Sequence, residues 1–123
     1  MALETPALRH RVRPELGSCY VKTDEIPWEP MAGAPGVQMK VLLQDTESGM
    51  FTALFKIEPG GVVPDHVHQA VEQTYVLEGT FAGSEGVATA GDFIWRPACN
   101  RHQAYSPDGC LILGFFLKPN KFL

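Results

Sequence analysis

The sequence has little of what marks secreted, disulfide-rich or membrane proteins. Its 123 residues include three cysteines, an odd number without paired spacing, so we expect free buried thiols rather than a disulfide framework. The longest strongly apolar run, residues 110–117, is far shorter than the about 20 residues of a membrane-spanning helix. Residues 1–16 contain no apolar stretch typical of a signal peptide. We therefore expect a cytoplasmic protein without a membrane partner.

Positive charge is equally scarce. Lys and Arg together number 10 against 14 Asp and Glu residues, which gives a net charge of -4, and the basic residues are scattered along the chain. Nucleic-acid binding requires a clustered positive field that attracts phosphate groups. The charge therefore excludes nucleic acid as an expected partner and favours a small molecule or another protein.

Long helical patterns are missing as well. The chain is interrupted by 12 Gly and 10 Pro residues, and short runs of β-favouring residues alternate with turn signals. A chain of this length is the size of one domain. The sequence predicts an all-β sandwich or closed barrel over residues 18–123, preceded by an N-terminal arm of residues 1–17. The expected strands are residues 18–23, 37–43, 50–57, 62–68, 71–77, 86–90, 93–96, 102–105 and 110–118.

Histidine is rare but concentrated. Three of the 4 histidines, His66, His68 and His102, lie in the region richest in strand and turn signals. His66 and His68 are two residues apart, so their imidazoles project from the same face of a strand. Glu72 follows where the next strand begins, and His102 follows the rigid turn at Pro97 on a facing strand. Imidazole and carboxylate ligands that converge in this way predict a divalent metal site.

Two segments of the chain resemble the motifs of the cupin family. The segment from Gly60 to Gly79, GGVVPDHVHQAVEQTYVLEG, matches every fixed position of the first cupin motif. The segment from Gly91 to His102, GDFIWRPACNRH, resembles the second motif but has Cys99 where the family usually has glycine. Ser106 likewise replaces a frequent asparagine. These departures concern the conformation of the turn rather than the ligands.

The resemblance implies a double-stranded β-helix, the cupin jelly-roll barrel, with one divalent metal ion. The implied ligands are His66, His68, Glu72 and His102, and Fe(II) or Zn is the expected metal, with Mn or Ni as alternatives. Trp28 and the stretches VLEGTF and SPDGC are similar to the zinc-binding cupin of ChrR-type anti-sigma factors. They are also similar to single-domain dioxygenases that cleave dihydroxyacetophenone or acetylacetone. A homodimer is expected, because cupins commonly pair and the apolar final strand with its KPNKFL tail offers a contact.

Strand alternation places further side chains near the predicted metal. Thr74, Val76 and Ala104 share the inward face with the ligands and are candidate substrate-binding residues, as is Trp95 at the mouth of the barrel. The thiol of Cys99 lies three residues before a predicted ligand and can act as a redox sensor or a fifth ligand. We favour the alternative of a buried spectator thiol, because nothing in the sequence indicates a lowered pKa.

Two functions are compatible with these features. In the first, the protein is a dioxygenase whose metal, Fe(II), binds a small ketone or diketone in open coordination positions. In the second, zinc closed by the four protein ligands stabilises a sensor or regulatory module of the ChrR type. The N-terminal arm is short for a sigma-binding region, so we expect the enzyme. A metal-free barrel is a third possibility, which the intact ligand set disfavours.

Overall fold

The structure is a computed structural model that describes residues 2–8 and 17–123. These residues form eleven strands and two single-turn 3-10 helices, which confirms the predicted all-β fold. The strands are β1 (Leu3–Glu4), β2 (Glu29–Pro30), β3 (Val37–Asp45), β4 (Phe51–Ile57), β5 (Val62–Val67), β6 (Glu72–Gly83), β7 (Gly86–Thr89), β8 (Phe93–Arg96), β9 (Arg101–Tyr105), β10 (Cys110–Phe116) and β11 (Lys121–Phe122), and the helices are η1 (Pro6–Leu8) and η2 (Thr23–Glu25). No helix in the described ranges is long and apolar enough to cross a membrane.

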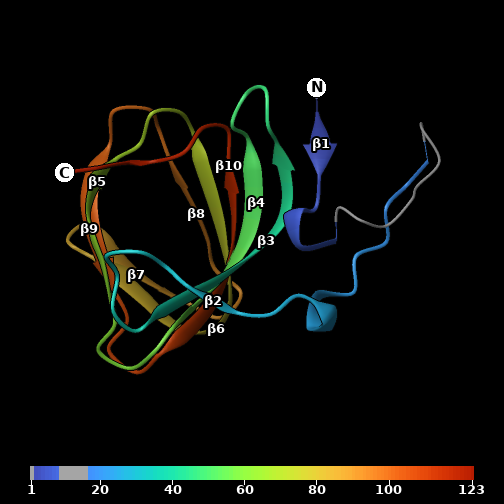
Figure 1. Cartoon of the computed structure of the whole chain (residues 1–123). Helices are drawn as coiled ribbons and strands as arrows, with labels where there is room; N and C mark the ends of the chain where they lie inside the picture. The colour runs from blue at the N-terminus through green and yellow to red at the C-terminus, as the bar shows by residue number, and fades with distance from the viewer. Residues whose placement is uncertain (1, 9–16) are drawn as a thin grey trace.

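The strands form one curled antiparallel sheet in the order β1-β3-β4-β10-β6-β9-β5-β11. Strand β6 belongs to both sides of the curl, because its first half pairs with β10 and β8 and its second half pairs with β7 and β9. We call β3, β4, β10, β8 and the first half of β6 the first wall, and β5, β9, β7 and the second half of β6 the second wall. The walls enclose a barrel (Figure 1), which confirms the predicted jelly roll in a single domain.

Alternation of side chains along the strands builds the core. In β4 and β10 every second residue is buried, as expected for strands with one face turned inward. The inward residues of both walls form one hydrophobic cluster, which includes Val37, Ala53, Phe55, Ile57, Val76, Phe81, Ala88, Ala104, Cys110, Ile112 and Phe116. Several members of this cluster, such as Phe55, Ile112 and Phe116, also line the cavity beside the site.

Gly79 lies at the point where β6 passes from one wall to the other. Its partner is Cys110 of β10, and the next residue, Thr80, already pairs with β7. Gly79 has φ 75°, and a Cβ atom there would overlap the carbonyl of Gly109. Only glycine fits this bend without displacing the neighbouring backbone. The glycine at the last position of the first motif therefore has a direct structural reason.

One predicted strand is wrong. Residues 18–23 form no strand, and the exposed segment ends in the helix η2 at Thr23–Glu25. Side chains hold this segment to the barrel: Lys40 Nζ donates a hydrogen bond to the Thr23 carbonyl at 2.9 Å, and Ile26 is buried. β-favouring residues alone do not make a strand, because a strand also needs a paired neighbour, and none of the strands in the described part of the chain pairs with residues 18–23.

The predicted N-terminal arm, residues 1–17, lies partly outside the described residues. Its described part is not loose throughout, because Leu3 and Glu4 pair with Asp45 and Gln44 at the edge of the first wall. The amide of Ala2 also donates a hydrogen bond to Asp45 Oδ1 at 2.8 Å. The boundary at residue 18 stays a prediction.

Candidate metal centre

Strand β5 and the residue that follows it aim two imidazoles into the barrel. His66 and His68 are both buried, and their ring centroids are 4.9 Å apart. The alternation that predicted a shared face is confirmed. His66 Nδ1 lies 2.7 Å from the Pro64 carbonyl oxygen, which can only accept, so Nδ1 carries the proton. Nε2 of His66 is therefore the nitrogen with a free lone pair, the state in which a metal-binding histidine is held.

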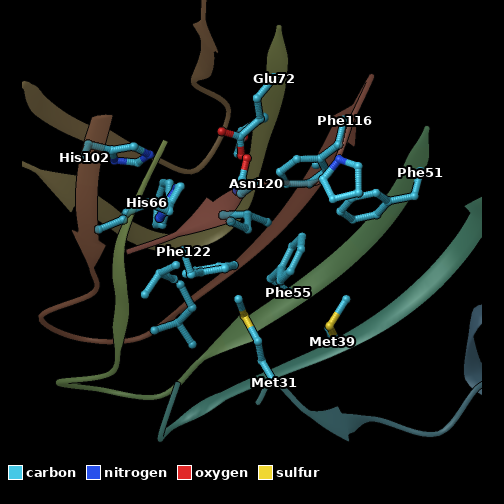
Figure 2. Close-up of a pocket in the computed structure, with 18 residues that line it drawn as sticks. Met31, Met39, Phe51, Phe55, His66, Glu72, His102, Phe116, Asn120 and Phe122 are labelled. Carbon is cyan, nitrogen blue, oxygen red and sulfur yellow. The ribbon is translucent and has the colours of Figure 1, made fainter. Parts of the chain in front are cut away.

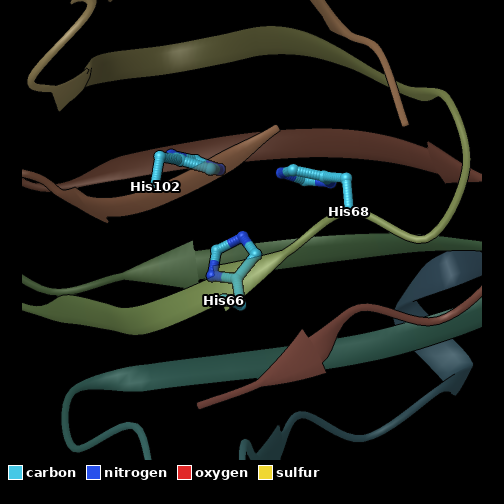
Figure 3. A group of neighbouring side chains, drawn as sticks. All are labelled: His66, His68 and His102. Carbon is cyan, nitrogen blue, oxygen red and sulfur yellow. The ribbon is translucent and has the colours of Figure 1, made fainter. Parts of the chain in front are cut away.

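Strand β9 adds the third imidazole from directly across the ladder. His66 and His102 are register partners, and their ring centroids are 4.5 Å apart. The rings of His68 and His102 are 5.0 Å apart and nearly parallel. One ligand atom from each of the three residues lies within 4.8 Å of the others, so the cluster can hold a metal ion (Figure 3). The structure thus brings together all three histidines that the sequence singled out.

The turn before β9 fixes His68 through its backbone. The amide of Cys99 donates to the His68 carbonyl at 2.7 Å, and the amide of His68 donates to the Asn100 carbonyl at 2.9 Å. Cys99 adopts φ 72°, the left-handed conformation that glycine favours, at the position where the family motif usually has glycine. This conformation leaves the Cys99 side chain exposed, so the expected buried thiol is wrong here. Cys19 is exposed as well, and of the three cysteines only Cys110 is buried.

Glu72 begins β6 and contacts the cluster through one histidine. Its Oε2 atom is 3.0 Å from His68 Nδ1, although the pair lacks hydrogen-bond alignment, and 3.8 Å from Arg96 Nε. Thr74 Oγ1 donates to the other carboxylate oxygen at 3.4 Å. In the described part of the chain, the group of mutually close ligand atoms consists of the three imidazoles. Glu72 therefore stays a predicted fourth ligand, placed where it can also orient His68.

Several buried nitrogens of the cluster have no hydrogen-bond partner. Both ring nitrogens of His68 and of His102, together with Glu72 Oε2, are buried without a hydrogen bond. Burial lowers the pKa of His102 to about 3, with Arg96 the next cause, and burial also lowers the pKa of His66. Both imidazoles are thus neutral at neutral pH, the form that binds metal. Buried polar atoms normally find partners, and a divalent cation supplies them for this donor set. The residues fit the expected ion.

An apolar cavity of about 230 Å³ adjoins the cluster. His66, His102 and Glu72 lie at one side of it, and the rest of its lining is mostly apolar and includes several phenylalanines and two methionines (Figure 2). Phe51 and Phe116 stack with ring centroids 4.4 Å apart, and Phe55 meets Phe116 edge-on at 5.8 Å. Met31, Met39 and Phe122 also line the cavity. The sequence analysis missed this lining, although the inward positions of β4 and β10 already carried its aromatic residues.

The C-terminal strand closes one side of the cavity. β11 pairs with β5, and Phe122 is the register partner of His66, with the two rings 5.2 Å apart. Pro119 and Asn120 line the cavity as well, and the Pro119 carbonyl accepts a hydrogen bond from Gln69 Nε2 at 2.6 Å. The tail that was expected to offer a dimer contact is thus held by its own barrel. The end of the chain covers the imidazole of a predicted ligand.

The predicted substrate-binding residues separate into two groups. Thr74 and Ala104 line the cavity, as strand alternation indicated. Val76 is fully buried in the core and is not among the lining residues. Trp95 pairs with Gln73, and both side chains point away from the barrel interior. The structure therefore keeps Thr74 and Ala104 as candidates and places Trp95 on the outer surface.

Comparison with known proteins agrees with this geometry. A family model described as ChrR cupin-like domain matches residues 17–119. The chain belongs to this cupin family. No curated protein matches the chain. The family assignment confirms the resemblance that the two motifs carried, and it places the three histidines of this cupin in the region that the family model covers.

Several solved structures share the fold of this cupin. A protein proposed to be an acetylacetone dioxygenase, from Methylibium petroleiphilum PM1, is 24% identical with a TM-score of 0.81, over 92% of this chain and 85% of that chain. An acetylacetone dioxygenase from Acinetobacter johnsonii is 17% identical with a TM-score of 0.76, over 92% and 81% of the two chains. The complex of Rhodobacter sphaeroides SigE with the anti-sigma ChrR contains a chain that is 27% identical, with a TM-score of 0.65, over 77% of this chain and 51% of that chain.

Proposed function

We propose that this cupin is a metal-dependent dioxygenase that acts on a small, largely apolar ketone or diketone. One observation carries the proposal: in a buried cluster of three imidazoles, His68 and His102 have ring nitrogens without partners, and His66 and His102 line an apolar cavity of about 230 Å³. Catalytic metal sites combine a few protein ligands with open positions next to a substrate cavity. The fold that the chain shares with acetylacetone dioxygenases supports the same reaction class.

The residues divide the work between holding the ion and binding the substrate. His66, His68 and His102 would hold the metal, and Glu72 would complete the set or orient His68. When bound, such an ion supplies Lewis acidity toward the ketone oxygens and, as Fe(II), the electrons for reaction with dioxygen. The phenyl side chains of the first wall bind the apolar part of the substrate and exclude water. Phe122 of β11 limits the length of the substrate that fits against His66.

The experiment is metal analysis of protein purified without added metal, followed by oxygen uptake with acetylacetone and dihydroxyacetophenone. We expect about one iron per chain and ketone-dependent uptake. His68→Ala should lower metal content and thermal stability together, because ion binding is linked to the folded state. Gln103→Ala is the matched control, since Gln103 is an exposed residue of β9 next to a proposed ligand. A folded protein that retains no divalent metal contradicts the proposal.

A zinc-binding regulatory module is the second candidate. Its support is the ChrR cupin-like family assignment, together with the 27% identity to a chain of the SigE–ChrR complex. Tightly held zinc, with no oxygen uptake on any tested ketone, would favour this function over the enzyme.

A further inference from the structure

Polar contacts surround His68 on several sides. Glu72 Oε2 lies 3.0 Å from His68 Nδ1 and 3.8 Å from Arg96 Nε. Arg96 Nη1 donates a hydrogen bond to Glu85 Oε1 at 3.4 Å, and Asn100 Nδ2 donates to the same oxygen at 3.2 Å. The Asn100 carbonyl in turn accepts a hydrogen bond from the backbone amide of His68 at 2.9 Å. These contacts close into a ring, which we call the polar ring, that begins and ends at a proposed metal ligand.

Arg96 is an unusual member of the polar ring, because it brings a positive charge to a proposed metal site. It is the register partner of Glu72 across β6 and β8, and both side chains are only 11% exposed. A guanidinium group is always charged, so a largely buried one needs a carboxylate beside it. A cation at this place also repels a metal ion and lowers the affinity of the site for it. The position of Arg96 therefore points to a role exerted through Glu72.

Glu72 is placed as a partner of a ligand rather than as a ligand. Among the described residues, the ligand atoms that lie within 4.8 Å of one another belong to three imidazoles, and Glu72 is not in this group. Thr74 Oγ1 donates to Glu72 Oε1 at 3.4 Å, while Oε2 contacts both His68 and Arg96. A carboxylate beside one nitrogen of a metal-binding histidine orients the ring and leaves the other nitrogen for the ion. The attraction of Arg96 opposes a movement of Glu72 toward the ion.

Arg96 acts from outside the apolar cavity. Glu72 lines that cavity, whereas Arg96 and Glu85 line a second cavity of about 300 Å³, and His102 borders both. Glu85 lies in the turn between β6 and β7 with its side chain 56% exposed, and it holds the guanidinium from the solvent side. Asn100 holds Glu85 in the same way from the turn before β9. Arg96 is therefore separate from the residues that line the proposed substrate cavity.

We propose that Arg96 is a positioning residue that holds Glu72 away from the metal ion, so that His66, His68 and His102 bind the ion without this carboxylate. Without Arg96, Glu72 would be a buried carboxylate that lacks its cationic partner, and the ion would be the positive charge that satisfies it. Removal of Arg96 should therefore add a carboxylate ligand to the centre. The inference rests on the proposed metal binding but not on the dioxygenase reaction, because a zinc-binding module would contain the same polar ring.

The test uses Co(II) bound to the full chain, because the visible absorption of Co(II) depends on the number and kind of its ligands. Arg96→Met should change this spectrum and raise the affinity for Co(II), measured by competition with a chelator, at least about 10-fold, the lower end of the effects of groups next to metal ligands. Arg96→Lys keeps the charge and should retain the wild-type spectrum. Arg101→Met is the matched control and should also retain it, since Arg101 precedes His102 but pairs with Asp65 and is 63% exposed.

Glu72→Gln supplies a test that does not depend on the folding of the Arg96 variants. In the wild-type chain it should leave the Co(II) spectrum unchanged and lower the affinity about 10–100-fold, as the loss of a partner of a metal-binding histidine does. Combined with Arg96→Met, it should abolish both the new spectrum and the gain in affinity. Circular dichroism verifies that the variants are folded.

Three results would overturn the role of Arg96. A wild-type spectrum that Glu72→Gln alters means that Glu72 is already a ligand. A spectrum that Arg96→Met leaves unchanged means that Arg96 does not control Glu72, and so does a change that persists when Glu72→Gln is added. A chain that takes up no Co(II) contradicts metal binding itself and therefore both proposals, whereas absent oxygen uptake contradicts the dioxygenase alone.

Discussion

The two walls of the barrel face one cavity with opposite chemistry. The second wall contributes His66, His68 and His102, whose nitrogens are largely without hydrogen-bond partners. The first wall contributes Phe51, Phe55 and Phe116, which pack against one another and against the core. Packing alone satisfies apolar groups, whereas buried imidazoles need a partner that the chain does not supply. The comparison teaches that the first wall provides packing and apolar contacts, whereas the second wall provides the imidazoles that can hold a metal ion.

The different chemistry of the two walls follows from which strands pair with each other. His102 is opposite His66 because β9 pairs with β5, so the ladder itself sets the spacing of two ligands. Phe116 is opposite Phe51 because β10 pairs with β4. The same rule of cross-strand neighbours thus produces a polar pair in one wall and an aromatic pair in the other. Substitutions in the two walls should therefore have different consequences.

The largest effect on stability is expected from Phe116→Ala in the first wall. Removing a buried phenyl ring costs about 3–5 kcal/mol in free energy of unfolding, from lost burial and the cavity left behind. Urea unfolding of the metal-loaded protein measures this loss. Metal content of the folded variant should be unchanged, because no imidazole is moved. Tyr20→Ala is the control, since it removes an aromatic ring that is 89% exposed. A folded Phe116→Ala protein without metal would show that the two walls are not independent.

In the second wall we expect stability to depend on pH. The cause here is protonation of buried histidines rather than loss of packing. Burial holds the pKa of His102 at about 3, against 6.5 for an unperturbed histidine, and it also lowers the pKa of His66. Between pH 3 and pH 6.5, His102 of the unfolded chain binds a proton that His102 of the folded chain does not. The stability of metal-free protein should therefore be full above pH 6.5 and fall as the pH drops toward 3.

The measurement for this pH effect is the thermal midpoint of metal-free protein between pH 7 and pH 4. Carboxylates also titrate in this range, so the informative quantity is the difference between wild type and His102→Ala. The variant should lose less stability on acidification. Parallel profiles for the two proteins would mean that His102 accepts its proton in the folded state without cost.

Much of this site could be predicted from the sequence, because its ligands depend on local geometry. The two-residue spacing of His66 and His68 determines their shared face, whatever the rest of the fold does. The entry of Glu72 into the next strand also follows from local turn signals. The sequence therefore predicts the cluster of three histidines without knowledge of the full strand order.

The apolar half of the site could not be predicted in the same way. Alternation along β4 shows that Phe51 and Phe55 point inward, but it does not show whether the opposite wall fills the space between them. A core and a cavity have the same pattern in the sequence, and Val76 and Thr74 illustrate this: both were predicted to line the pocket, and only Thr74 does. The closure by Phe122 depends on a two-residue strand, too short to leave a pattern.

The smallest expected effect concerns Cys99, in the turn that joins the two walls. A non-glycine residue with φ 72° costs about 1–2 kcal/mol, and glycine recovers this at the expense of about 0.4–1 kcal/mol of unfolded-state entropy. Cys99→Gly should therefore stabilise the protein by about 0.5–1 kcal/mol and leave metal content unchanged, because the backbone hydrogen bond to His68 persists. Urea unfolding measures the gain, and Ala98→Gly is the control. Ala98 does not have a positive φ, so glycine there should destabilise the protein. Equal losses for both variants would mean that the Cys99 side chain, although exposed, makes contacts that outweigh the strain of its backbone.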